Sequence, residues 1–240
     1  MVTPPRIVRR ENHQAPSCRL TLRCTGLVPA SCWVPSAKLQ RVRGQAGELG
    51  SVRRLRMIPA GYMAKHVKSR PSTIDAPQVA DVYSVSSCIS EDFADFINFW
   101  MHNGFWLFDS PAIISDLAQT HGIDLAKTRL FYYEVAENEF AVSWRKFEPE
   151  HSFETNVLRP AIKHLEGFDI ASFYAGSNPE CSPLSCNAVA GEVPVNEHCL
   201  LASEDDAKRL IESEKFEHVE PGPYRIFAVY SVGDPWPPGV

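Results

Sequence analysis

The sequence predicts an α+β domain at residues 57–234, with a mostly antiparallel sheet of about six strands and three helices. Strand-like and helix-like segments follow one another without the regular alternation that builds parallel sheets. Each predicted helix begins at a serine N-cap signal, and segments rich in Val, Tyr and Phe are typical of strands. The proline-rich residues 235–240 are expected to form a C-terminal tail.

The charge distribution separates this domain from the segment before it. Residues 1–56 carry 11 basic and 2 acidic side chains, a net charge of +9, whereas the rest of the chain carries 13 basic and 27 acidic side chains, a net charge of −14. The first segment has one aromatic residue and several prolines, so it lacks the apolar surface that would offset the entropy of ordering. We expect a disordered basic tail. The alternatives are a targeting segment or a start-site artefact, with translation beginning at Met57 or Met63.

The first two predicted elements are a strand and a helix. Val79–Cys88 is rich in Val and Tyr and is expected to form a strand. A helix should follow, capped by Ser90 and ended by Gly104. Its apolar residues recur at helical spacing and are expected to be buried: Phe93, Phe96, Ile97, Trp100 and Met101.

Two further helices have clear start signals. Ser110 followed by Pro111 is typical of a helix start, and His121 followed by Gly122 is typical of a helix end. Ser203, with an acidic residue three positions later, predicts the third helix.

The remaining strands follow from apolar runs bounded by turn residues. The expected strands are Arg129–Ala136 and Phe140–Phe147, forming a hairpin around residues 137–139, and then Phe168–Ala175, Cys199–Ala202 and Tyr224–Val232. The tetrapeptide Val-Tyr-Ser-Val occurs at residues 82–85 and 229–232. One match this short is near chance expectation, so we expect no internal repeat.

One loop concentrates cysteine and histidine. Cys181 and Cys186 lie in a proline-containing segment, and His198 and Cys199 follow it. These four residues are candidate Zn²⁺ ligands, with Cys88 as an alternative, because thiolates and imidazole suit this ion. The spacing is poor for a zinc site, since adjacent strand residues point to opposite faces and one of the last pair would face away.

Three other interpretations of these cysteines remain open. Cys181 or Cys186 could be a nucleophile with His198 as its base, or the two thiols could form a redox pair. The sequence favours a structural role, in which Cys88 and Cys199 are buried as small apolar residues and the proline-containing loop simply holds its shape.

The composition narrows the functional classes. The chain has no run of 18 apolar residues, and an acidic body repels phosphate backbones and anionic membranes. We therefore expect no nucleic-acid or membrane partner. The favoured hypothesis is a small, acidic, cytoplasmic binding or regulatory module with a protein partner and no cofactor. The alternative is a metal-dependent or thiol-dependent enzyme that uses the Cys181–Cys199 region, with zinc as its candidate cofactor.

Overall fold

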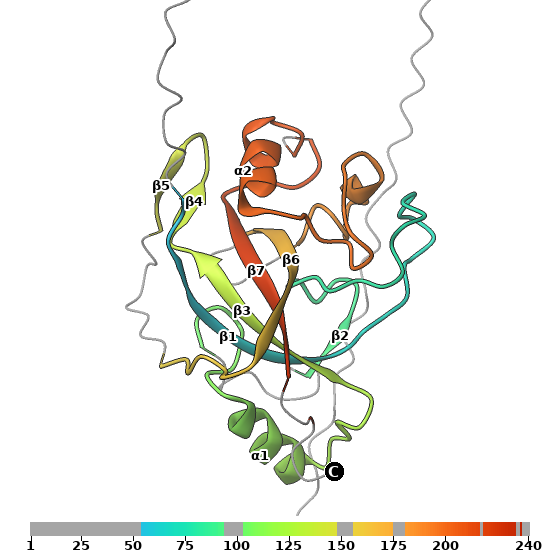
Figure 1. Ribbon diagram of the computed structural model, residues 1–240, viewed down its shortest axis with the longest axis vertical. Helices are drawn as coiled ribbons and strands as arrows, with labels where there is room; N and C mark the ends of the chain where they lie inside the picture. The colour runs from blue at the N-terminus through green and yellow to red at the C-terminus, as the bar shows by residue number, and fades with distance from the viewer. Residues whose placement is uncertain are drawn as a thin grey trace, which may run out of the picture. The chain divides into compact units, whose positions relative to one another are not determined.

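The computed structural model describes residues 54–93, 103–147, 156–174, 181–216, 218–233 and 236. They form a twisted sheet with α-helices at its opposite ends (Figure 1). The strands are β1 (Met57–His66), β2 (Glu91–Asp92), β3 (Arg129–Ala136), β4 (Asn138–Phe140), β5 (Trp144–Lys146), β6 (Lys163–Ser172) and β7 (Tyr224–Val232); the helices are α1 (Pro111–His121), α2 (Glu204–Glu212) and a 3₁₀ turn at Val189–Gly191.

Strand β7 is the centre of the sheet. It pairs with β6 on one edge and with β3 and β4 on the other. Strand β3 also pairs with β1, which pairs with β2, and β4 pairs with β5. Every one of these pairings is antiparallel. The predicted α+β class with a mostly antiparallel sheet is therefore confirmed.

The two long outer strands share one irregularity. The pairing register of β1 shifts at Ala60, just before Gly61, and that of β6 shifts at Glu166, just before Gly167. Gly61 has φ +140° and Gly167 has φ +152°, which are conformations that residues with a Cβ rarely adopt. Each strand therefore has a bulge that its glycine permits.

In β1, the bulge is bonded to a loop that contains Asn103. The side-chain amide of Asn103 donates to the carbonyl of Ala60 at 2.8 Å. Its side-chain oxygen accepts from the backbone N–H of Phe105 at 2.9 Å and of Leu107 at 3.3 Å. One asparagine thus connects the loop to the strand.

The bulge of β6 is bonded to a loop that contains Asn196 in the same way, so the chain contains two copies of this arrangement. The amide of Asn196 donates to the carbonyl of Glu166 at 2.7 Å. Its side-chain oxygen accepts from the N–H of His198 at 2.9 Å and of Leu200 at 3.0 Å. The bonding pattern is the same as that around Asn103, and in both loops the two N–H donors lie two and four residues after the asparagine.

A helix and a strand complete each copy. The N-cap serines, Ser110 of α1 and Ser203 of α2, each lie seven residues after the loop asparagine. Strand β3 follows α1, and β7 follows α2. Gly61 pairs with Tyr133, Gly167 pairs with Val229, and these two partners pair with one another. The copies are therefore related by an approximate two-fold axis through that central pair, and the expectation of no internal repeat is wrong at the level of structure.

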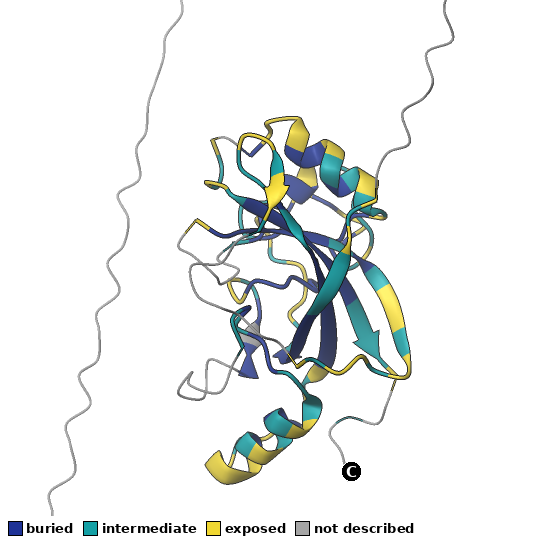
Figure 2. Ribbon diagram, turned by 90° about the vertical axis from the view of Figure 1, so that its left-hand side faces the viewer, coloured by how far each residue is buried: buried dark blue, intermediate teal, exposed yellow. Residues whose placement is uncertain are grey.

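The copies bury two apolar clusters. Helix α1 contributes Ile114 and Ala118 to the first cluster. Helix α2 contributes Leu210 and Ile211 to the second. Figure 2 shows dark, buried strands between the helices, whose outer faces are exposed. No helix in the described residues is both long and apolar enough to cross a membrane.

Local signals predicted some elements well. The serine caps of α1 and α2 are confirmed, because each side chain accepts a backbone N–H from the first turn of its helix. The predicted Tyr224–Val232 strand has the same bounds as β7. The helix count is wrong: the described residues contain two α-helices, and the expected first turn after Ser90 is instead strand β2, which pairs with β1.

The other differences arise from long-range pairing. Val79–Cys88 is not a strand, because its backbone turns to the Asn196 loop, as in the bond from Tyr83 N–H to the His198 carbonyl at 3.1 Å. The predicted hairpin is shifted, since β3 pairs with β1 and β7 while the tight hairpin joins β4 and β5. Cys199–Ala202 contributes one isolated bridge. The expected tail up to residue 53, and residues 94–102 of the expected aromatic helix, lie outside the described residues.

Replacing either bulge glycine with alanine should destabilise the chain. A Cβ at Gly61 would lie 2.6 Å from the Leu107 Cβ, and one at Gly167 would lie 2.7 Å from the Leu200 Cβ. We expect each variant to lose about 2–4 kcal/mol of unfolding free energy in urea titrations. Gly122→Ala is the control, because its Cβ would meet open space and the change should cost about 1 kcal/mol from its positive φ alone. Bulge variants as stable as this control would contradict the repeat motif.

Candidate metal centre

Three thiols converge at one place on the chain. The sulfur atoms of Cys88, Cys181 and Cys186 all lie within 4.8 Å of one another. The Sγ atoms of Cys88 and Cys181 are 3.3 Å apart. Tetrahedral Zn–S bonds of ~2.3 Å place neighbouring sulfurs at about 3.8 Å, so small side-chain adjustments bring all three thiols to one ion.

The loop after β6 holds two of the thiols. The N–H of Ser172, the last residue of β6, donates to the Cys181 carbonyl at 2.8 Å. The N–H of Cys186 donates to the Ser182 carbonyl at 2.8 Å. This single turn brings the second thiol back towards the first.

A buried carboxylate connects this loop to the segment that carries Cys88. Asp169 Oδ2 accepts from the Ser84 hydroxyl and from the N–H of Val85, both at 2.9 Å. Its Oδ1 accepts from the Ser182 hydroxyl at 2.6 Å and from the N–H of Ile170 at 2.8 Å. Burial raises the pKa of Asp169, and these donors oppose that rise by stabilising the charged form.

A buried ammonium holds the opposite side of the Cys88 segment. Lys65 Nζ donates to the carbonyls of Ser84 at 2.8 Å, Val85 at 3.2 Å and Ser86 at 3.3 Å. It also forms an ion pair with Asp92 at 2.9 Å, and both side chains are almost completely buried. Lys65 therefore binds the carbonyls of the Cys88 segment, and Asp169 binds its hydroxyl and N–H donors.

Serine hydroxyls complete the surroundings of the thiols. Ser86 Oγ accepts from the N–H of Cys88 at 3.2 Å and lies 3.6 Å from the Cys186 sulfur. Cys88 itself is exposed, whereas Cys181 and Cys186 are partly buried. Solvent therefore reaches the centre from the Cys88 side.

The two inner thiols hold their protons at neutral pH. Burial raises the pKa of Cys181 to about 12, and its contact with Cys88 adds to the rise. The hydrogen bond to Cys88, together with burial, raises the pKa of Cys186 well above its ordinary value. A protonated thiol is a weak nucleophile, so this environment disfavours the nucleophile hypothesis unless a cation stabilises the thiolates.

The other two predicted ligands lie in the Asn196 loop. Cys199 is buried in the second apolar cluster with φ +63°. His198 Nδ1 donates to Asp81 Oδ1 at 2.5 Å, and the ring centroids of His198 and Tyr83, which stack, are 3.9 Å apart. Neither residue belongs to the three-thiol cluster. In the described part of the chain, this cluster is the group in which at least three potential metal ligands lie close together.

Cys88 completes the cluster in their place. The sequence predicts Cys88 as an alternative ligand, since its distance to the loop does not follow from the sequence. Only a weak sequence signal favours Cys88 as a ligand. Several serines precede Cys88, and serines also lie next to Cys181 and Cys186. The contact spans 93 positions, so no local spacing rule reveals it.

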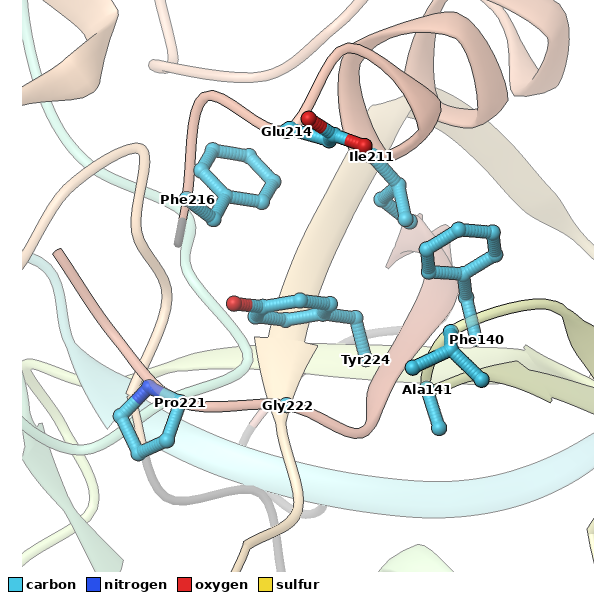
Figure 3. Close-up of a pocket in the computed structure, with 9 residues that line it drawn as sticks. Phe140, Ala141, Ile211, Glu214, Phe216, Pro221, Gly222 and Tyr224 are labelled. Atoms are coloured by element: carbon cyan, nitrogen blue, oxygen red, sulfur yellow. The ribbon is translucent and has the colours of Figure 1, made fainter. Parts of the chain in front are cut away.

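A pocket with a mixed apolar and polar lining, which includes Glu214, lies beside the segment that precedes β7. Its volume is about 300 Å³, and Phe140, Ile211, Phe216 and Tyr224 form its walls (Figure 3). Pro221 also lines it, and the Pro221 carbonyl accepts from the Ser172 hydroxyl. The same serine holds the Cys181 carbonyl, so the cysteine loop and one pocket wall are anchored at a common residue.

Comparison of the chain with protein-family models, with curated proteins and with solved structures finds no match. The functional argument therefore depends on the geometry alone.

In the metal-free, reduced protein, alkylation at neutral pH should follow exposure and protonation. We expect iodoacetamide to modify Cys88 at least about tenfold faster than Cys186 or Cys199, because one thiol is exposed while the others are protonated or buried. Peptide mass spectrometry of timed samples gives the order. Equal or faster modification of Cys186 would show that the described environment of this thiol is wrong.

Proposed function

We propose that this chain binds a thiophilic metal ion, with Zn²⁺ as the first choice, through Cys88, Cys181 and Cys186. The convergence of three sulfur atoms within 4.8 Å carries the proposal. Thiolates select Zn²⁺, Cu⁺ and iron–sulfur clusters over hard cations. The acidic body described by the sequence also favours uptake of a cation over an anion.

The ligand count points to a centre with an open position. Structural zinc sites use four protein ligands, whereas catalytic zinc sites use three and leave the fourth position to water or substrate. Among the described residues the cluster offers three thiols, one of them exposed, and this count matches the second pattern. The metal-dependent alternative from the sequence analysis is therefore preferred to a thiol nucleophile.

Binding of a protein partner stays a prediction. The observation that favours it is a run of exposed apolar residues before and within β6, namely Leu158, Ile162 and Leu165. Such residues often lie at interaction surfaces. The contacts of the thiol cluster are more specific, so metal binding is the function we place first.

Zinc binding should be stoichiometric and should depend on the three clustered cysteines. Full-length protein reconstituted in reducing buffer and then desalted should retain one zinc per chain by elemental analysis. Each of Cys88→Ser, Cys181→Ser and Cys186→Ser should lower zinc affinity by about 100-fold or more, because a thiolate ligand is lost.

The matched controls are the two predicted ligands that lie outside the cluster. Cys199→Ala and His198→Gln should leave the zinc content at one per chain. A loss of zinc in either control with retention in Cys88→Ser would contradict the proposed ligand set and restore the one predicted from sequence.

Zinc affinity should rise steeply with pH. The raised pKa values of Cys181 and Cys186 mean that both thiols are protonated at neutral pH, so binding must release at least two protons. Apparent affinity should increase by at least about 100-fold per pH unit between neutral pH and the ordinary thiol pKa. Competition with a chromophoric chelator at several pH values measures the slope, and a slope near zero would exclude these thiols as ligands.

A further inference from the structure

A second concavity lies away from the cysteine cluster, between the start of β3, the end of β7 and the bulge of β6. Its volume is about 360 Å³, which is within the range of small-molecule sites. Tyr83, Arg129, Glu166, Ser231 and Trp236 are among its lining residues. Unlike the pocket beside α2, this cleft contains charges of both signs.

The two charges in the cleft do not neutralise one another. Within the described residues, Arg129 donates to the Tyr83 hydroxyl and lies over the Tyr83 ring, but it forms no ion pair with Glu166. Arg129 is exposed, so most of its guanidinium donors are available to a ligand. A cation and an anion held apart in one cleft are complementary to a zwitterion.

The surroundings of Glu166 hold its carboxylate in place. Its Oε1 accepts from the Ser231 hydroxyl and lies 3.4 Å from His164 Nδ1. Its Oε2 lies 3.8 Å from His198 Nε2, and the other ring nitrogen of that histidine is held by Asp81. These contacts make Ser231 and His198 positioning residues for the carboxylate.

The internal repeat provides a comparison for these residues. Glu166 corresponds to Ala60, because each is the bulge residue whose carbonyl accepts from the loop asparagine. His198 corresponds to Phe105, because each donates its N–H to that asparagine. Ala60 and Phe105 are both buried apolar residues. The scaffold therefore needs neither charge nor imidazole at these positions, and the second copy carries both.

The arginines differ in the same way. Arg129 and Arg225 each lie four residues before the strand residue that faces the bulge glycine. Arg225 is buried, and its guanidinium carbon lies 3.9 Å from the ring centroid of Phe147 and 5.0 Å from that of Phe105. The second copy thus encloses its arginine, Arg225, among phenylalanines, whereas the first copy presents Arg129 at an open, charged cleft.

We propose that this cleft binds a small zwitterion of the α-amino-acid class with an aromatic side chain. The carboxylate pairs with Arg129, the ammonium group pairs with Glu166, and the ring packs against the aromatic wall. The partly buried Trp236 supplies that wall, next to the buried Tyr83 ring, and the Trp236 indole N–H donates to the Thr128 hydroxyl at 2.8 Å. The site is independent of the metal proposed above.

Three related probes test the charge requirement by isothermal titration calorimetry on the full chain. L-Phenylalanine carries both charges, L-phenylalaninamide lacks the carboxylate, and 3-phenylpropanoate lacks the ammonium group. We expect phenylalanine to bind, and each analogue to bind at least about tenfold more weakly, because each loses one charge-assisted contact.

Two variants assign each charge to its residue. Arg129→Gln should weaken phenylalanine binding by about tenfold and remove the preference over the amide. Glu166→Gln should also weaken phenylalanine binding by about tenfold, and it should remove the preference over 3-phenylpropanoate. Arg209→Gln, which removes an exposed arginine of α2 paired with Asp206, is the control for charge loss elsewhere and should bind like the unaltered chain.

The outcomes separate this site from the metal centre. Cys88→Ser should lose zinc and bind phenylalanine normally. Near-ultraviolet circular dichroism of Glu166→Gln verifies that its tertiary structure is retained. No binding of phenylalanine by the unaltered chain, equal binding of all three probes, or unchanged binding in both charge variants would overturn the proposal.

Discussion

The buried carboxylate of Asp169 is the interaction on which the candidate metal centre depends. An isolated carboxylate is costly to bury, and this one is stabilised because it accepts four hydrogen bonds. Two of these donors belong to the Cys88 segment and one to the Cys181 loop. The group that would otherwise destabilise the core thus ties together two loops that are distant in sequence. Lys65 completes the fixation from the carbonyl side of the first loop.

The duplicated scaffold separates the residues that maintain the fold from the residues of the proposed sites. The repeated parts are the bulged strands, the asparagine loops, the capped helices and the central strands. Their contacts stabilise the fold. The candidate sites lie where the copies differ. The cysteines lie in loops outside the shared motif, and the zwitterion cleft uses Glu166 and His198, for which the first copy has Ala60 and Phe105. Both proposed sites therefore use residues that lie outside the shared motif or differ between the copies.

Sequence reasoning succeeded where the signal was local. The serine caps and the glycine after His121 defined α1, and the Tyr224–Val232 pattern defined β7. Strand β1 was missed because Pro59 and Gly61 interrupt its alternation, although the bulge makes both acceptable. The repeat left a sparse signal: Asn, Leu and Ser recur at Asn103, Leu107 and Ser110 and again at Asn196, Leu200 and Ser203. Cys88 could not be assigned because Asp169 and Lys65 fix the segment that carries it through contacts that no spacing rule contains.

X-ray absorption at the zinc edge of the zinc-loaded full chain tests the central claim most directly. This measurement reports the number and type of atoms bound to the metal. The account predicts three sulfur atoms at ~2.3 Å and one lighter ligand at ~2.0–2.2 Å. A shell of two sulfurs with imidazole scattering, or a shell of oxygen and nitrogen alone, would show that the thiols brought together by Asp169 do not form the metal centre.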